Sequence, residues 1–228
     1  MKVKDKMNRV FILWSVFIGS ILAMPLQAQT LKEIEAARVT LPNGWHLTPV
    51  GKTLPLGDLP LNIAVSPSKK MAAITNNGQS TQTVQLVDIK KGITTDTILI
   101  GKSWLGLTFS DDGKTLYASG GNDNIIIRYQ IKNKKFSGAD TIFIGKPWPE
   151  KISIAGLALD DVNFRLYAVT KENNSLYVVD TQTKKVISQH PLGGEGYTCI
   201  LSPDRQTLYA SCWAVSYTHL TLPTKRIV

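Results

Sequence analysis

The sequence has little of the chemistry that most enzymes use. Its 228 residues include only three histidines and two cysteines, and His46 and His190 are isolated, so a multi-histidine metal centre is nearly excluded. No Gly-x-Ser-x-Gly elbow, His-Glu-x-x-His pair, Walker-type loop or Cys-x-x-Cys pair is present. We therefore assign no catalytic residue, metal ligand or cofactor, and we expect that this chain by itself is not an enzyme.

Acidic residues are outnumbered, but the basic excess is not concentrated on the body of the chain. There are 26 Lys and Arg against 17 Asp and Glu, a net charge of +9, of which residues 1–29 carry +3 and residues 215–228 carry +2. A nucleic-acid-binding surface needs Lys and Arg clustered on one face. We therefore expect no nucleic-acid partner.

The apolar run near the start is too short for a membrane span. Val10–Met24 has 15 uncharged residues, and a transmembrane helix needs about 20. The run follows a basic head and precedes a polar exit with Ala28, which is the pattern of a secretory signal peptide. We predict a signal peptide at residues 1–28, with a membrane anchor as the alternative, and a periplasmic or secreted mature chain without stable membrane insertion.

A pattern of short apolar segments recurs four times. Its anchors are AVSP at Ser66, TFSD at Ser110, ALD at Leu159 and ILSP at Ser202, which are spaced 44, 49 and 43 residues apart. After each anchor come segments rich in Val, Ile, Tyr and Thr, bounded by Gly, Pro, Asn or Asp, and such segments are typical of strands.

Four short strands per unit, with a period in the forties, indicate a β-propeller blade. We predict an all-β fold, namely a β-propeller fragment of four-stranded antiparallel blades, with a β-sandwich or solenoid as the alternative. A lead-in segment at 29–60 precedes blades at about 61–100, 105–144, 154–190 and 197–214, the last of which is half a blade. Small residues suit first strands at a crowded axis, and they occur at Ala64, Gly106, Ala155 and Gly156.

The repeats resemble those of a known family. Leu176–Asp180 (LYVVD) and Asp111–Tyr117 (DDGKTLY) resemble the YVTN-type repeat of bacterial YncE-like propellers. Leu41–Trp213 more closely resembles a secreted subgroup whose propeller precedes an alkaline-phosphatase-like phosphoesterase domain. The resemblance implies Asp and His metal ligands and a nucleophile in that domain. None of these positions lies in this sequence, so no catalytic residue is carried over.

The last residues depart from the repeat. After Thr207–Ala214 the repeat predicts a polar turn and a third strand, but Val215–Thr224 reads VSYTHLTLPT. This string resembles a translated transposase-type sequencing adapter. We interpret residues 215–228 as an artefactual tail, with a divergent natural tail as the alternative, and we expect the natural protein to be longer.

Cys199 and Cys212 fall on the first two strands of the fourth blade. We predict that they are diagonal neighbours on one face, with Ala210 opposite Cys199. A disulfide between adjacent strands requires awkward geometry, so we expect two buried, reduced thiols, with a disulfide as the alternative. The glycine-rich residues 193–196 precede a strand rather than a helix, which favours a connection between blades over a phosphate site.

Two sets of loops should share one face of a propeller: the connections between blades and the loops between second and third strands. The first set contains Lys102, Trp104, Lys146, Trp148, Glu195 and Tyr197, and the second contains Asn76, Asn77, Asn122, Asp123, Asn124, Glu172, Asn173 and Asn174. Aromatic rings beside amides and lysines suit an unknown polar ligand, a peptide, a glycan or a downstream catalytic domain. The structural alternative is that Asn supplies left-handed turns and that Trp packs between blades.

Two functions follow from these observations. The lack of catalytic motifs favours a non-catalytic binding or scaffold β-propeller of the cell envelope. The resemblance favours the N-terminal propeller part of a secreted phosphoesterase whose catalytic domain lies outside this sequence. Within the binding hypothesis, Trp104 and Trp148 occupy equivalent places in repeated Gly-Lys-x-Trp connections.

We expect export in a bacterial host to remove about the first 28 residues, because the basic head, apolar run and Ala28 exit form a cleavage signal. Intact-mass measurement of the exported product checks this. If the protein is instead found in the membrane fraction with residues 1–24 still attached, these residues are a membrane anchor.

Overall fold

The structure is a computed structural model that describes residues 30–36, 38–48 and 53–213. The predicted signal peptide and the predicted tail at 215–228 both lie outside the described residues. The chain divides into two compact units, one ending at Thr53 and the other beginning at Leu54. The division falls inside the lead-in segment predicted for residues 29–60.

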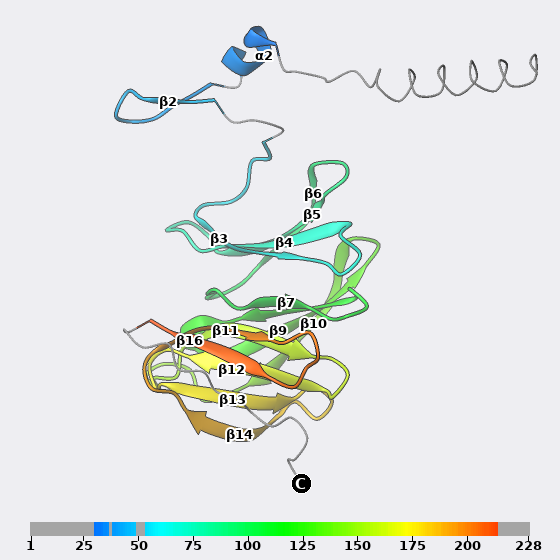
Figure 1. Cartoon of the computed structure of the whole chain (residues 1–228), viewed down its shortest axis with the longest axis vertical. Coiled ribbons are helices and arrows are strands. Elements are labelled where there is room, and N and C mark those ends of the chain that lie inside the picture. Colours follow the sequence, from blue (N-terminus) through cyan, green and yellow to red (C-terminus); the bar gives the residue numbers. More distant parts are fainter. Residues whose placement is uncertain (1–29, 37, 49–52, 214–228) are drawn as a thin grey trace, which may run out of the picture. The chain divides into compact units, whose positions relative to one another are not determined.

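The N-terminal unit contains a short helix and a small hairpin (Figure 1). Helix α2 (Leu31–Ala36) precedes β1 (Val39–Thr40), which pairs antiparallel with β2 (His46–Leu47). Thr30 Oγ1 accepts a hydrogen bond from Glu33 N at 3.3 Å, and Thr30 N donates to Glu33 Oε2 at 2.8 Å. This reciprocal pair is a capping box. In the described part of the chain, no helix has the length and apolar character needed to cross a bilayer.

The second unit is built from antiparallel sheets that follow one another along the chain (Figure 1). Three sheets have four strands, each paired with the next in sequence, and the last described sheet has two. The strands are β3 (Pro60–Val65), β4 (Met71–Asn76), β5 (Thr83–Asp88) and β6 (Ile93–Leu99); β7 (Leu107–Phe109), β8 (Thr115–Ser119), β9 (Ile125–Lys132) and β10 (Lys135–Phe143); β11 (Ile154–Asp160), β12 (Arg165–Thr170), β13 (Ser175–Asp180) and β14 (Lys185–Pro191); and β15 (Gly196–Leu201) and β16 (Leu208–Cys212). A 3₁₀ turn, η1 (Gly121–Asp123), lies between β8 and β9.

The serine that anchors three of the repeats closes the turn between the first and second strands. Ser66, Ser110 and Ser202 each accept a hydrogen bond on Oγ from the backbone N–H five residues further on, at 3.1, 2.9 and 3.0 Å. In the third sheet, Asp160 takes this place and accepts from the backbone and side-chain nitrogens of Asn163 at 3.2 and 2.7 Å. Side-chain hydrogen bonds of this kind stabilise tight turns, which explains why the anchor recurs.

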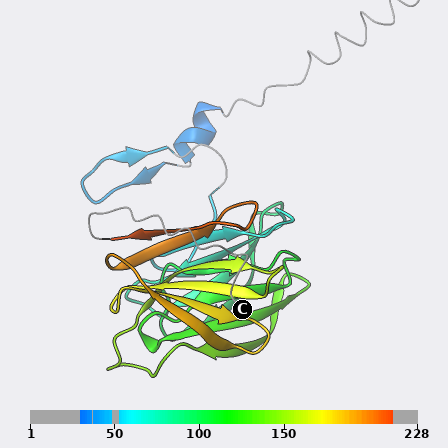
Figure 2. The same cartoon turned by 60° about the horizontal axis from the view of Figure 1, so that its bottom comes forward.

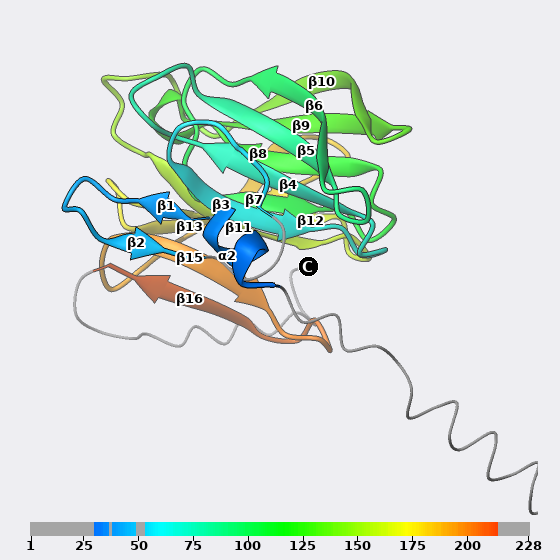
Figure 3. The same ribbon diagram turned by 90° about the horizontal axis from the view of Figure 1, so that it is seen from above.

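Hydrophobic clusters fill the space between consecutive sheets, which lie face to face (Figure 2). The first strands are neighbours: β3 contacts β7, β7 contacts β11, and β11 contacts β15; Figure 3 shows β3, β7 and β11 gathered together. The fully buried residues of successive clusters include Leu86 and Leu116, then Ile126 and Leu166, then Leu176 and Leu208. This arrangement confirms the predicted all-β propeller fold with four-stranded antiparallel blades.

The first strands of neighbouring sheets approach so closely that two positions exclude a side chain. A Cβ atom at Gly106 would lie 2.7 Å from the carbonyl oxygen of Ala155, and one at Gly156 would lie 2.5 Å from Cα of Thr198. Both neighbours are backbone atoms, which cannot rotate away. The close approach explains the small residues predicted at the axis.

Charged turns close one end of this axis. Arg205, in the turn between β15 and β16, places Nη2 2.5 Å from Asp111 Oδ2 and Nη1 3.0 Å from Asp160 Oδ1. These hydrogen bonds, first to Asp111 and then to Asp160, raise the pKa of the Arg205 guanidinium. Because strands alternate in direction, the connections between sheets emerge at the opposite end.

The fourth sheet pairs Cys199 as predicted, but the burial of Cys212 differs from the prediction. Cys199 lies opposite Ala210, and both cysteines are thiols that pack in the cluster between the third and fourth sheets. Burial raises the pKa of Cys199 to about 12. The prediction that both thiols are buried is wrong for Cys212, which is half-buried. Cys212 is the last residue of β16 and pairs with Gly196, where a β-bulge interrupts the register.

We expect Gly156→Ala to lower the free energy of unfolding by about 1–3 kcal/mol, because an added methyl group overpacks the contact with Thr198. Gly138→Ala in β10 is the matched control, since its Cβ would meet only the Gln130 side chain at 4.0 Å. That variant should stay within about 0.5 kcal/mol of the parent chain. Chemical denaturation measures both, and equal stability of the two variants would contradict the close approach.

Candidate functional site

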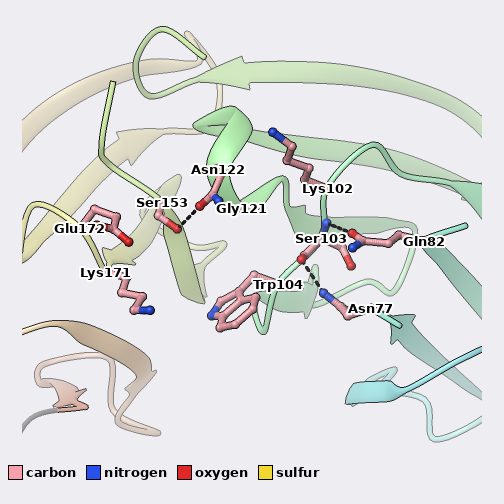
Figure 4. A pocket seen from close by; sticks show the side chains of 10 residues that line it. All are labelled: Asn77, Gln82, Lys102, Ser103, Trp104, Gly121, Asn122, Ser153, Lys171 and Glu172. Atoms are coloured by element: carbon pink, nitrogen blue, oxygen red, sulfur yellow. Dashed lines mark hydrogen bonds between the residues drawn. The ribbon is translucent and has the colours of Figure 1, made fainter. Parts of the chain in front are cut away.

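A cavity of about 240 Å³ opens where loops of the first three sheets meet (Figure 4). Both loop sets that we expected to share a face contribute to it. The connections supply Lys102, Ser103, Trp104 and Ser153, and the loops between second and third strands supply Asn77, Gln82, Gly121, Asn122, Lys171 and Glu172. Five of the predicted candidates are therefore brought together: Lys102, Trp104, Asn77, Asn122 and Glu172.

Trp104 stands on a backbone segment that hydrogen bonds hold in place. Ser103 N donates to Gln82 Oε1 at 2.7 Å, and Asn77 Nδ2 donates to the Ser103 carbonyl oxygen. Ser103 is 5% exposed, whereas Trp104 is 39% exposed. The indole is thus open to solvent on a fixed backbone, which reduces the conformational cost of binding.

The charges around the cavity balance. Lys102 Nζ lies 3.2 Å from Asp123 Oδ1, which belongs to η1. Lys171 and Glu172 lie next to each other across the cavity from Asn77, with Trp104 between the two walls (Figure 4). Lys102, Lys171 and Glu172 line the cavity, and Asp123 lies beside it as the partner of Lys102, so two cations and two anions are close to the cavity.

Two polar atoms in the cavity wall lack a hydrogen-bond partner. Asn77 Oδ1 and Ser103 Oγ are buried, and neither has a partner among the described residues. An unsatisfied buried polar group costs roughly 1–3 kcal/mol. Both atoms are enclosed by the protein, so a ligand in the cavity reaches neither of them without a movement of these side chains.

An aromatic cavity of about 170 Å³ adjoins the polar one and shares Trp104 and Lys171 with it. Its other lining residues are Gly196, Tyr197 and Trp213. The Tyr197 and Trp213 rings have centroids 5.1 Å apart and planes tilted by 55°. Trp213 N donates to the carbonyl oxygen of Glu195 at 2.7 Å, which fixes the backbone beside the ring. Tyr197, a predicted candidate, therefore faces the same tryptophan as the polar cavity.

The structure separates Trp148 from Trp104. Trp148 is 55% exposed, with Lys151 Nζ 5.6 Å from its ring centroid, and it lines neither cavity. The connection between β10 and β11 is longer than that between β6 and β7, so Ser153 rather than Trp148 reaches the polar cavity. The two Gly-Lys-x-Trp segments are therefore not equivalent in space.

Asn124 holds the connection between β10 and β11. It is fully buried with a left-handed backbone, φ 57°. Its Nδ2 donates to the carbonyl oxygens of Lys146 and Glu150 at 2.6 and 2.8 Å, and its Oδ1 accepts from Ser153 N at 2.8 Å. Its side chain is thus occupied by the fold, and the Lys146 backbone is one of its partners.

The remaining asparagines shape local structure. Asn173 Oδ1 accepts from Thr170 Oγ1 at 2.5 Å, and Asn173 Nδ2 donates to Tyr177 Oη at 2.7 Å. Asn174 has a left-handed backbone, φ 49°. Asn76 is buried at the end of β4 rather than on the loop face. These residues form turns and local hydrogen bonds, and they line neither cavity.

The two described histidines pair locally. His46 Nδ1 lies 3.1 Å from Thr40 Oγ1, and His190 Nε2 lies 3.0 Å from Ser188 Oγ. Within residues 30–36, 38–48 and 53–213, no group of three or more His, Cys, Asp or Glu is placed to hold a metal ion.

Sequence reasoning missed seven lining residues: Gln82, Ser103, Gly121, Ser153, Lys171, Gly196 and Trp213. For two of them a signal exists. Ser103 and Ser153 each lie three residues before an axial glycine, Gly106 or Gly156. Aligning the repeats on those glycines identifies the serines, whereas aligning on Gly-Lys-x-Trp does not.

We expect Asn124→Ala to lower the free energy of unfolding by about 2–4 kcal/mol, because it removes the three hydrogen bonds of a buried side chain and leaves alanine in a left-handed conformation. Asn174→Ala is the matched control: it keeps the left-handed strain, but Asn174 is exposed. Thermal and chemical denaturation compare the two. If Asn124→Ala lowers the free energy of unfolding no more than Asn174→Ala does, the side-chain hydrogen bonds of Asn124 contribute nothing to stability.

No family model and no curated protein matches this sequence. Among solved structures, the chain is similar to hydrazine synthase of Kuenenia stuttgartiensis, with a TM-score of 0.59 and 18% identity over 73% of this chain and 46% of that chain. It is also similar to the WD40 repeats of RRP9, with a TM-score of 0.56 and 16% identity over 70% of this chain and 47% of that one. The chain spans about half the length of these structures. At such identities the likeness shows the fold alone, and that fold is a β-propeller.

Proposed function

We propose that this chain is a non-catalytic binding propeller of the cell envelope, whose ligand enters at the loop face around Trp104. The observation that carries the proposal is the convergence of a polar and an aromatic cavity on one partly exposed indole. Pockets with an aromatic wall and a few fixed polar groups are the usual form of small-molecule sites.

The fold supports binding because rigid sheets position the loops. The cavity walls come from loops of three sheets whose cores are buried, and Ser103 and Ser153 are each fixed by a backbone hydrogen bond. Loops on a rigid scaffold are frequent locations of binding residues. Little of the binding free energy is then spent on ordering the site.

The envelope location rests on the pattern of residues 1–28, a basic head, an apolar run and an Ala28 exit. A second candidate function rests on the resemblance of Leu41–Trp213 to YncE-like propellers of secreted phosphoesterases. In that case the loop face would dock a catalytic domain supplied by a longer protein. The two candidates differ in the occupant of the face, a small ligand or a folded domain.

We expect small polar probes to bind at this face of the full chain. N-acetylglucosamine, inorganic phosphate and the peptide Gly-Phe-Gly are added in turn while backbone amide shifts are followed by NMR. At least one probe should shift the amides of Ser103, Gly121 and Gly196, and should leave Gly113 at the opposite end unchanged.

Trp104→Ala should abolish those shifts at a stability cost of about 1 kcal/mol, because the ring is already partly exposed. Trp148→Ala is the matched control and should keep them, since Trp148 lines neither cavity. A loss of roughly 3–5 kcal/mol, as in core truncations, together with unchanged probe shifts would show that Trp104 is a packing residue and would refute the proposed site.

A further inference from the structure

The geometry of the two cavities points to a ligand class, and this step rests on the proposed function. We propose that the site binds a neutral oligosaccharide, with one sugar ring in the aromatic cavity and the next in the polar cavity. Three features of the site favour this ligand class: the aromatic walls, the mixture of hydrogen-bonding groups and the nearby anions that pair with the lysines.

Aromatic residues from two parts of the chain line the aromatic cavity. Trp104 comes from the connection between the first two sheets, Tyr197 lies on β15, and Trp213 directly follows β16. A pyranose ring has C–H groups on its faces and hydroxyls on its rim. Its faces therefore pack against aromatic rings while its hydroxyls remain free for polar partners, which an entirely apolar ligand would not need.

The residues that line the polar cavity include both hydrogen-bond donors and hydrogen-bond acceptors. Asn122 accepts from Ser153 Oγ on Oδ1 at 2.6 Å, which leaves its Nδ2 as a donor. Gln82 accepts from Ser103 N on Oε1, which leaves its Nε2 likewise. The Glu172 carboxylate is an acceptor in the same lining. A sugar hydroxyl donates and accepts at once, so this mixture suits it better than it suits a group that only accepts.

The balance of charge argues against an ionic ligand. Lys102 is already paired with Asp123 at 3.2 Å, and Lys171 lies beside Glu172 in the same wall. A phosphate or polyuronate in the cavity would meet the Glu172 carboxylate, and of the two lining lysines only Lys171 is not paired with Asp123. A neutral molecule with many hydroxyls incurs no such repulsion.

The length of the ligand follows from how the cavities adjoin. Both are lined by Trp104 and Lys171, and each volume, about 240 and 170 Å³, is large enough for a ring-sized group. A single sugar would fill only one of them. A disaccharide or longer chain that crosses Trp104 would use both.

The test titrates the full chain with glucose, cellobiose, maltose and N,N′-diacetylchitobiose, and with inorganic phosphate, digalacturonate and Gly-Phe-Gly, followed by NMR shifts at Ser103, Gly121 and Gly196. At least one neutral disaccharide should bind at least fivefold more tightly than glucose and than either anion. Its dissociation constant should change less than about twofold between low and high salt, because screening acts on charged partners.

Single substitutions test the contribution of each cavity to binding separately. Trp213→Ala should remove the advantage of the disaccharide over glucose, and Glu172→Gln should weaken the disaccharide at least fivefold. Trp148→Ala, on the same face, should change neither. Unchanged disaccharide binding in both Trp213→Ala and Glu172→Gln would overturn the assignment of rings to cavities.

The remaining outcomes distinguish this inference from the function on which it rests. If an anion or the peptide binds through Trp104 more tightly than every neutral disaccharide, the oligosaccharide inference is wrong and the binding function stands. If no probe shifts the loop-face amides, both are wrong.

Discussion

The close approach of the first strands is the constraint on which the second unit depends. Gly106 and Gly156 lie against backbone atoms of the next sheet, where a methyl group has no room. Two hydrogen bonds cross the same narrow region, from Asn62 Nδ2 to the Leu105 carbonyl oxygen at 2.5 Å and from Ser119 Oγ to the Ile154 carbonyl oxygen at 2.6 Å. With the first strands this near, the sheets can pack face to face, and their connections must gather around the end of the axis.

That gathering produces the site. The connections between sheets bring Trp104 and Ser153 to the end of the axis, and the loops between second and third strands surround them. The hydrogen bonds of Asn77, Gln82 and Asn124 then fix the backbone of these connections. The Gln82 and Asn122 side chains, which accept hydrogen bonds through their oxygens, also line the cavity, and their amide nitrogens are donors that a ligand can use.

Much of the fold was predictable because each repeat carries its own turn chemistry. The serine hydroxyl that closes the first turn appears in the sequence as a recurring anchor, and the strand lengths follow from apolar segments between turn residues. The loop face was predictable from the order of the strands. In an antiparallel sheet the direction of each strand determines at which end the following loop emerges.

The individual site residues were less predictable because they depend on the length of each connection and on packing at the ends of strands. Trp148 resembles Trp104 in sequence, yet the longer connection carries it away from the cavity and brings Ser153 instead. Asn124 and Asn122 are two residues apart, but one is fully buried and the other is exposed. The local sequence pattern does not determine which asparagine side chain forms hydrogen bonds with a backbone segment that is distant in sequence. Cys212 also differs from expectation, because it is half-buried at the end of β16, where it pairs with Gly196 beside a β-bulge.

The Arg205 pairs have a consequence for how the unit opens. In most repeat proteins each repeat contacts only its neighbours, so a terminal repeat can fray while the rest stays folded. Arg205 of the fourth sheet contacts Asp160 of the third and also Asp111 of the second, 94 residues away in sequence. Opening the last sheet must therefore break contacts with two sheets at once. This one side chain makes local fraying more costly and the unfolding of the unit more cooperative.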